Sequence, residues 1–154
     1  TASTTAQLAL GDALAVAVLD ARGFKKDDFA RSHPGGSLGR RLLTLLSDIM
    51  RTGDQIPEVS LDVTLSELMR EMSQKGLGAT AVVDENRRVL GIFTDGDLRR
   101  LVEKGLDLRS MQAADVMHPN PTTLRDTALA VEAAELMELK RITSVLVVDE
   151  NNIL

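Results

Sequence analysis

The sequence predicts an α/β (α+β) fold in which one small motif occurs twice behind a helical segment. First, AVVDENRRVLG at Ala81–Gly91 has a counterpart in LVVDENNIL at Leu146–Leu154, at an offset of 65 residues. Second, in both copies a segment with helical spacing of apolar residues precedes a short run rich in β-branched residues. Third, the Ala-rich residues before Asp48 have a different character. We therefore expect an internal duplication.

Copy one (residues 46–107) is expected to contain a helix, two strands that form a hairpin, and a second helix. Leu65, Leu68 and Met72 recur at helical spacing, and Lys104 and Gly105 are typical of a helix end. The predicted ranges are Thr64–Lys75 for the first helix, Ala79–Val83 and Val89–Phe93 for the strands, Asp84–Asn86 for the turn, and Asp95–Glu103 for the second helix.

Copy two (residues 108–154) repeats the first part of this order. Asp115-Val116-Met117 matches Asp48-Ile49-Met50, and a helix over Ala128–Lys140 and a strand over Ser144–Val148 are predicted. Leu154 comes before any second strand, Thr-Asp-Gly-Asp turn or last helix. We therefore expect copy two to be truncated at its C-terminus.

Residues 1–45 are expected to be the edge of a domain that begins upstream. A predicted helix over Thr4–Ala21 is apolar on nearly every side, which is typical of a helix inside a larger body, and Gly23 is suited to cap its end. A short helix over Lys25–Arg31 is predicted to end at SHPGGSLGRR, Ser32–Arg41, because proline and adjacent glycines interrupt regular structure.

The composition excludes several classes of function. With 18 basic and 23 acidic residues among 154, the net charge of -5 leaves no broad basic face for nucleic acid or an anionic membrane. The uncharged run Ala13–Leu19 is shorter than the roughly 20 residues that span a bilayer. The absence of cysteine fits a cytoplasmic protein. With only two widely separated histidines, no metal site is expected.

The stretch GIFTDGDLRR, Gly91–Arg100, allows three interpretations. It can be a capping box with Thr94 as N-cap and Asp97 at N3, or an Asp-Gly hairpin turn. It can also bind a ligand, because free N–H groups at a helix start attract phosphate and an ionised acid accepts hydrogen bonds from a ribose diol. The local sequence favours capping, and capping is compatible with binding. Arg99 and Arg100 lie close enough to compensate a phosphate.

A strand, the run Gly-Ile-Phe-Thr-Asp-Gly-Asp and a helix within a tandem repeat resemble a CBS domain pair (Bateman module). The resemblance implies a nucleotide site at Gly91, Thr94 and Asp97, with the hydroxyl near phosphate or ribose and the acid on the ribose hydroxyls. It further implies ligand-binding positions at Gly78, Ala79, Thr80, Val116, Met117, His118 and Thr122, and in copy two at Thr143 and Ser144.

The N-terminal region carries a second resemblance. TASTTAQLALGDALAVAVLDARGF followed by DFARSHPGGSLGRRLL resembles the end of the sugar isomerase (SIS) domain in bacterial D-arabinose-5-phosphate isomerases, where a CBS pair follows directly. This implies a parent enzyme that interconverts D-ribulose 5-phosphate and D-arabinose 5-phosphate for synthesis of Kdo, a sugar of lipopolysaccharide.

The resemblance implies that His33 is catalytic in that parent, since isomerisation needs acid–base groups and histidine titrates near neutrality. The other interpretation of His33 is a solvated loop residue. The family's lysine and glutamate partners precede this segment, so we expect this chain alone to be inactive.

The expected function is therefore regulatory. Pathway logic proposes CMP-Kdo as the effector, and AMP or ATP is the alternative because adenine nucleotides are common ligands of CBS pairs. No cofactor is expected. The family resemblance implies a homodimer of CBS pairs, within a homotetramer in the parent. A purely structural dimerisation module is a further alternative, and a chain that retains isomerase activity is the competing hypothesis of another class.

Overall fold

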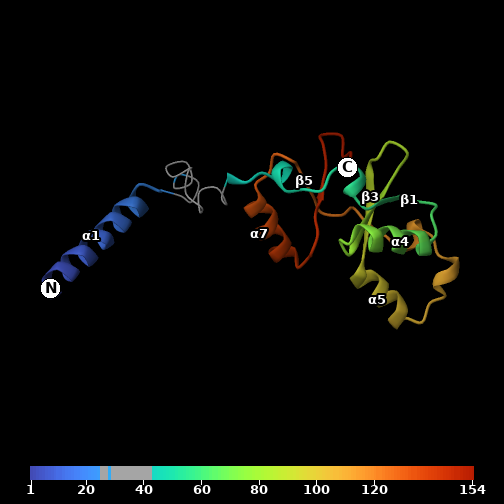
Figure 1. Cartoon of the computed structure of the whole chain (residues 1–154), viewed down its shortest axis with the longest axis horizontal. Coiled ribbons are helices and arrows are strands. Elements are labelled where there is room, and N and C mark those ends of the chain that lie inside the picture. Colours follow the sequence, from blue (N-terminus) through green and yellow to red (C-terminus); the bar gives the residue numbers. More distant parts are fainter. Residues whose placement is uncertain (25–27, 29–42) are drawn as a thin grey trace. The chain divides into compact units, whose positions relative to one another are not determined.

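The computed structural model describes residues 1–24, 28 and 43–154 (Figure 1). The chain divides into two compact units, Thr1–Leu43 and Thr44–Leu154, and each is described by itself. The predicted helix over Lys25–Arg31, the loop over Ser32–Arg41 and His33 lie outside the described residues, apart from Asp28. The predicted boundaries after residues 45 and 107 stay predictions.

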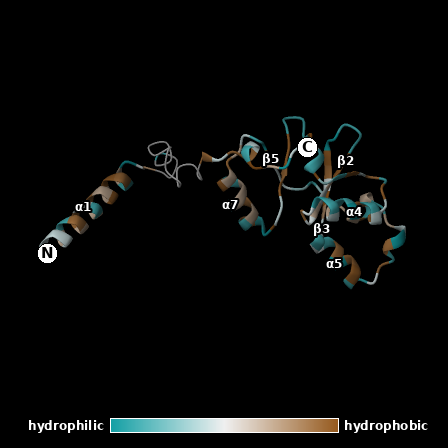
Figure 2. Cartoon of the chain, viewed as in Figure 1, coloured by the Kyte–Doolittle hydropathy of each residue, from teal (hydrophilic) through white to brown (hydrophobic). Residues whose placement is uncertain are grey.

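The first unit contains one described helix, α1 (Ala2–Ala21), which begins two residues before the predicted Thr4. The Thr1 hydroxyl accepts a hydrogen bond from the Thr4 N–H at 3.4 Å, and Gly23 follows the helix with φ of 64°. Apolar side chains are distributed along the helix, and all its residues are exposed within this structure (Figure 2). Its length and apolar composition alone would let it cross a membrane, and a helix in the core of a soluble domain has the same two properties.

The second unit contains both copies of the repeat. In chain order its described elements are η1 (Leu46–Asp48), η2 (Gly53–Gln55), β1 (Glu58–Ser60), α4 (Leu65–Lys75), β2 (Ala79–Val83), β3 (Val89–Thr94), α5 (Asp95–Glu103), η3 (Leu108–Ser110), α6 (Ala113–Val116), β4 (His118–Pro119), β5 (Thr123–Leu124), α7 (Ala130–Lys140) and β6 (Leu146–Val147). The predicted elements of copy one are confirmed with two differences at their ends: Thr64 is the N-cap of α4 instead of its first residue, and β3 ends at Thr94 instead of Phe93.

The strands form a sheet in the order β1-β2-β3-β4 and a separate pair, β5-β6. Strands β1 and β2 are parallel, whereas β2-β3 and β3-β4 are antiparallel. Strands β5 and β6 are parallel, and their register repeats that of β1 and β2: Glu58 lies opposite Ala81, and Thr123 lies opposite Leu146. The repeat seen in the sequence is therefore also a repeat of strand register.

The core of copy one lies between α4 and the sheet. Leu65, Leu68 and Met72 of α4 pack with Val82 of β2 and Phe93 of β3, and all five are nearly or fully buried. Helix α4 begins at a capping box: the Thr64 N–H donates to Glu67 Oε2 at 2.9 Å. It ends at Gly76, whose φ of 68° allows a left-handed cap. These contacts hold the β2-β3 hairpin firmly at the point where α5 begins.

The two copies are interlocked at their first segments. The Leu46 N–H of copy one donates to the Ala128 carbonyl of copy two at 2.8 Å. In the reverse direction, the Ala113 N–H of copy two donates to the Val63 carbonyl of copy one at 2.9 Å. Each copy's opening segment is thus bonded in front of the other copy's helix. Strand β4, which follows α6, then pairs with β3 of copy one.

The turns after β2 and β6 have the same hydrogen bonds. Asp84 Oδ1 accepts from the N–H groups of Asn86 and Arg88, each at 2.8 Å. Asp149 Oδ1 accepts from those of Asn151 and Ile153 at 2.8 and 2.9 Å. Such Asx turns follow from the shared Asp-Glu-Asn sequence.

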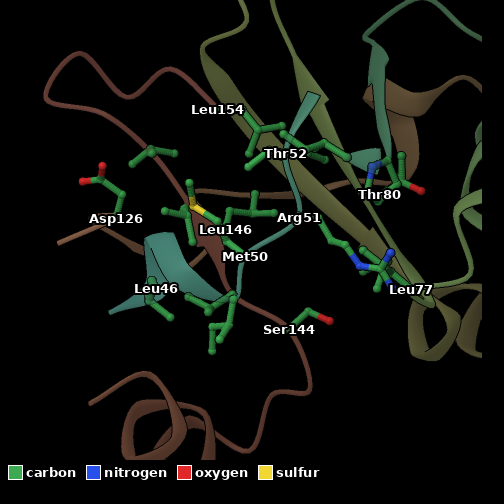
Figure 3. A pocket seen from close by; sticks show the side chains of 18 of the residues that line it. Leu46, Met50, Arg51, Thr52, Leu77, Thr80, Asp126, Ser144, Leu146 and Leu154 are labelled. Atoms are coloured by element: carbon green, nitrogen blue, oxygen red, sulfur yellow. The ribbon is translucent and has the colours of Figure 1, made fainter. Parts of the chain in front are cut away.

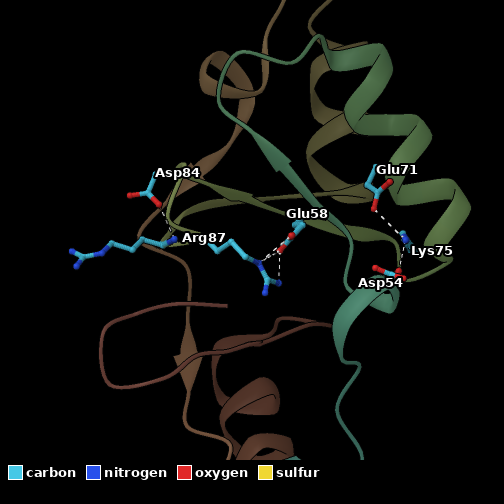
Figure 4. A network of polar contacts seen from close by, with 7 residues as sticks. Asp54, Glu58, Glu71, Lys75, Asp84 and Arg87 are labelled. Atoms are coloured by element: carbon cyan, nitrogen blue, oxygen red, sulfur yellow. Dashed lines mark hydrogen bonds and ion pairs between the residues drawn. The ribbon is translucent and has the colours of Figure 1, made fainter.

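Two groups of polar contacts lie beside the turn of copy one: one joins the turn to β1, and the other joins α4 to η2 (Figure 4). The Arg87 guanidinium donates to both carboxylate oxygens of Glu58, with its shortest contact, Nη2 to Oε2, at 2.8 Å. Lys75 Nζ lies 3.8 Å from Glu71 Oε1 and donates to the Asp54 carbonyl oxygen. These exposed contacts attach the turn to β1 and attach η2 to α4.

Copy two departs from prediction at two elements. Helix α7 begins at Ala130, because Leu129 occupies the N-cap position, so the predicted start at Ala128 is wrong by two residues. Strand β6 covers only Leu146–Val147, so the predicted strand over Ser144–Val148 is too long. Among the described strands β6 pairs with β5, whereas β2 pairs with a strand on each side.

Candidate functional site

The predicted ligand-binding motif forms a corner where β3 runs directly into α5. Thr94 ends β3 in an extended conformation, and Asp95 begins the helix. The backbone N–H and the hydroxyl of Thr94 both donate to Asp97 Oδ2, at 2.9 and 2.6 Å. Capping by the Asp97 carboxylate is therefore confirmed, and the Asp-Gly hairpin interpretation is wrong.

The second carboxylate oxygen of Asp97 faces two basic side chains. Arg100 Nη2 lies 2.5 Å from Oδ1, and His118 Nε2 lies 2.8 Å from the same atom. Asp97 is only 5% exposed, whereas the side chains of Arg100 and His118 are 58% and 63% exposed. A buried acid is thus covered by two side chains that themselves extend into solvent and have room to move.

The carboxylate of Asp97 is held in its charged form. Burial by itself raises the pKa of Asp97, but hydrogen bonds from the Thr94 hydroxyl, Arg100 and the Thr94 N–H, with the charge of His118, outweigh burial. The net effect lowers the pKa of Asp97 below its ordinary value. Asp97 is therefore an ionised hydrogen-bond acceptor at neutral pH, which is the form that binds vicinal hydroxyls.

Two of the predicted glycines allow close approach at this corner. A Cβ at Gly91 would collide with Met117 Sδ and would lie 2.9 Å from the His118 carbonyl oxygen. Gly78 has φ of 63°, and a Cβ there would lie 2.8 Å from Asp95 Oδ2. The Asp95 N–H donates to the Gly78 carbonyl at 3.0 Å. Gly91, Met117, His118 and Gly78 are therefore brought together with Thr94 and Asp97.

The other predicted residues lie elsewhere. Ala79, Thr80, Thr143 and Ser144 line a cavity of about 620 Å³ between the two copies (Figure 3). The hydroxyl of Thr80 is fully buried and has no hydrogen-bond partner among the residues that the structure describes. Val116 is part of the core, and Thr122 accepts a hydrogen bond from Lys140 Nζ at 3.0 Å. Ala79 is the ladder partner of Thr94, so one pair of strands connects the corner with the cavity.

Sequence reasoning missed part of the cavity wall. Met50, Arg51 and Thr52 line the cavity, and Figure 3 shows Met50 near Leu146 of β6, with Leu77 and Thr80 on the other side. The signal was present, because Asp48-Ile49-Met50 matches Asp115-Val116-Met117, which makes Arg51 the counterpart of His118. Among the described residues, no group of three or more His, Cys, Asp or Glu side chains is arranged to hold a metal ion.

Comparison with known sequences identifies related proteins. The CBS domain family matches residues 46–104 and 113–154. The arabinose 5-phosphate isomerase KdsD of Escherichia coli K12 is 53% identical over 154 residues, which are 100% of this chain and 47% of that protein. The Pseudomonas aeruginosa protein of the same name is 49% identical over 152 residues, 99% of this chain and 47% of its own length. The chain thus spans about half the length of these relatives, and the predicted resemblance to them is confirmed.

Solved structures share the fold of the second unit. A CBS domain protein from Pyrobaculum aerophilum, complexed with AMP, has a TM-score of 0.63 at 24% identity, covering 70% of this chain and 81% of that one. The cytosolic domain of the Mg²⁺ channel MgtE, in complex with ATP, has a TM-score of 0.53 at 27% identity, covering 65% of this chain and 40% of that one. The predicted fold class is therefore confirmed.

Proposed function

This chain belongs to the CBS domain family, and on that premise we propose that it is the nucleotide-binding regulatory module of an arabinose 5-phosphate isomerase. The observation that carries the proposal is the corner at Asp97: a buried, ionised acid lies at the start of a helix, and one of its carboxylate oxygens contacts two exposed basic side chains. The carboxylate is needed to cap the helix start, but the two cations that contact the second carboxylate oxygen play no part in the cap.

The chemistry of the corner suits a ribose and a phosphate. When Arg100 and His118 move outward, Asp97 Oδ1 is free to accept hydrogen bonds from two vicinal ribose hydroxyls. The displaced Arg100 guanidinium then lies one helical turn from the acid and is suited to pair with a phosphate. The positive end of the α5 dipole favours the same anion. Binding therefore exchanges an internal ion pair for contacts with a ligand of matching charge.

Two effectors fit this proposal. Adenine nucleotides are supported by the AMP and ATP complexes of the two structures with the same fold. CMP-Kdo follows from pathway logic alone, as the activated end product of the proposed pathway, and it also carries a ribose and a phosphate. Both ligands offer the diol that Asp97 requires, so the acid does not select between the two bases.

The parent enzyme is proposed to interconvert D-ribulose 5-phosphate and D-arabinose 5-phosphate in the cytoplasm, with residues 1–45 as the end of its SIS domain and His33 in its active site. His33 alone lacks partners for acid–base chemistry, so this chain by itself should form no ketose from D-arabinose 5-phosphate. Measurable turnover by the isolated chain would contradict this. The CBS domain pair is further proposed to form a homodimer with the CBS pair of a second chain.

The nucleotide site is tested by titration calorimetry of this chain with AMP, ATP and CMP-Kdo. We expect one of them to bind and Asp97→Ala to weaken that binding at least about tenfold, because a charge-assisted pair of hydrogen bonds is lost. Asp95→Ala is the matched control, since Asp95 is an exposed acid two residues away, whereas the Thr94 hydroxyl donates to Asp97. If Asp97→Ala and the wild type bound the nucleotide with equal affinity, Asp97 would not be part of the site. If the wild type bound none of the three ligands, a purely structural module would be favoured.

A further inference from the structure

The backbone of His118 is held beside the corner by the pairing of two strands. His118 begins β4 and lies opposite Ile92 of β3, two residues before β3 ends at Thr94. This close approach needs Gly91, because a Cβ there would lie 2.9 Å from the His118 carbonyl oxygen. The register of the two strands therefore fixes the backbone of His118, and the imidazole is the part that can move.

The imidazole of His118 contacts a buried acid but is itself exposed. Its Nε2 atom lies 2.8 Å from Asp97 Oδ1, although the side chain of His118 is 63% exposed and that of Asp97 only 7%. A change of side-chain rotamer at His118 therefore moves the ring into water without repacking the core. A ligand that accepts or donates at Oδ1 has to compete with the imidazole for the same atom.

Of the three groups that meet at Oδ1, the imidazole is the one whose charge changes near neutral pH. Burial alone would raise the pKa of Asp97, but hydrogen bonds from the Thr94 hydroxyl and from Arg100 outweigh burial and lower it, so the acid stays charged. A guanidinium such as that of Arg100 stays protonated throughout this range. A histidine side chain gains or loses its proton between about pH 5 and about pH 8. A protonated imidazole brings a full charge to the acid, whereas a neutral ring offers at most a hydrogen bond.

The elements around this contact contribute no other histidine. Strand β3, the described neighbour of β4, has no titratable side chain. Helix α5 also carries Asp95, Arg99 and Glu103, and α6, which precedes β4, carries Asp115, whose carboxylate caps the start of that helix. Carboxylates and guanidinium groups as a class do not titrate between about pH 5 and about pH 8. The chain has one other histidine, His33, and no cysteine.

We propose that His118 is a proton-controlled competitor for the ribose of the ligand. The protonated imidazole pairs with Asp97 and withholds Oδ1 from a ligand, whereas the neutral imidazole leaves Oδ1 to the vicinal hydroxyls of a ribose. A proton on His118 and a ribonucleoside therefore weaken each other's binding, and affinity falls as the pH falls. This inference rests on the proposed nucleotide site at Asp97 and adds the regulation of that site by pH.

The competition is tested by titration calorimetry of this chain with adenosine and with cytidine, at about pH 5.5 and at about pH 7.5. These nucleosides carry the ribose diol without a phosphate, so neither a titrating phosphate nor its attraction to a protonated His118 alters the result. Affinity should be at least about threefold lower at the lower pH, a modest change because a partly exposed ion pair is weak. Equal affinities at the two pH values would overturn the proposal.

Two histidine variants assign the pH dependence to its residue. His118→Gln keeps a hydrogen-bond donor but carries no charge, so its affinity should be the same at both pH values and close to that of the wild type at the higher pH. His33→Gln is the matched control, because it removes the other histidine and should keep the difference seen in the wild type. Circular dichroism checks that each variant is folded at both pH values. A difference that persisted in His118→Gln, or that vanished in His33→Gln, would overturn the proposal.

The 2′-deoxy forms of the two nucleosides distinguish failure of the competition from failure of the nucleotide site. If the ribonucleosides bound more tightly than the deoxy forms, but equally at both pH values, the site would stand and the competition alone would be refuted. If the ribo and deoxy forms bound equally, no diol would be held, and both proposals would fall. If no nucleoside bound at either pH, the competition would fall, and the titrations with AMP, ATP and CMP-Kdo would decide the nucleotide site by themselves.

Discussion

The two copies share a sequence pattern and a strand register but differ in how much of the strand forms. Strand β2 has five residues, all buried, whereas β6 has two, both half-buried. Each pairs in the same register with the strand before it. The difference lies on the other edge, where β3 completes the pairing of β2 only. The same register thus forms beside one neighbour in copy two and beside two neighbours in copy one.

The helices of the two copies differ in a similar way. In α4, Thr64 and Glu67 form a capping box, and Gly76 provides the left-handed end. In α7, Leu129 stands at the N-cap without a side-chain cap, although Glu132 still accepts from its N–H at 2.9 Å. Arg141 takes the left-handed position with φ of 54°. Copy one therefore has the better local signals at both helix ends.

The largest effect should come from removing the main contribution of β3 to the core. Phe93→Ala should lower the free energy of unfolding by about 3–5 kcal/mol, because a fully buried ring is replaced by a cavity. Urea denaturation measures the loss. Leu139→Ala in α7 is the control, since Leu139 is 80% exposed and its removal should change stability by less than about 0.5 kcal/mol. Similar losses for both variants would show that β3 does not anchor copy one.

A smaller effect is expected at the cap that copy two lacks. Thr64→Ala should lower the free energy of unfolding by about 1 kcal/mol, because the helix start loses its side-chain acceptor. Thr64→Ser keeps the hydroxyl and should stay close to the wild type. Thermal unfolding followed by circular dichroism compares the three proteins. If Thr64→Ala and Thr64→Ser unfold at the same temperature, the capping box does not account for the difference between α4 and α7.

The smallest effect, visible only in acid, concerns Asp97. Its folded-state pKa lies below the ordinary value of 3.8, so the folded state binds its proton less readily than the unfolded state does. The resulting stability is fully present above about pH 4 and is lost as the pH falls through the folded-state pKa. The free energy of unfolding should therefore fall less steeply between pH 4 and pH 2.5 in Asp97→Asn than in the wild type. Parallel pH profiles would contradict this.

Much of copy one could be predicted because its signals are local. Apolar spacing located α4, β-branched residues located β2, and the Thr94-Asp97 pair located the start of α5. The site was predicted less completely. Arg100 was expected to lie near Asp97. The contact of both Arg100 and His118 with the same carboxylate oxygen was not, because His118 reaches Asp97 only through the pairing of β4 with β3. Strand β1 was not predicted, since its three residues are recognisable only beside β2.

The sequence by itself determined the duplication, the helices and the identity of the acid at the corner, because these depend on periodicity and on contacts between residues three or four apart. Only the tertiary structure decided which edge of which strand is covered, where the cavity lies and what faces Asp97. Those features arise from the interlocked opening segments, which bring Leu46 to Ala128 and Ala113 to Val63. Pairings between residues this far apart in the chain cannot be recognised in any single stretch of sequence, because neither segment carries a pattern that identifies its partner.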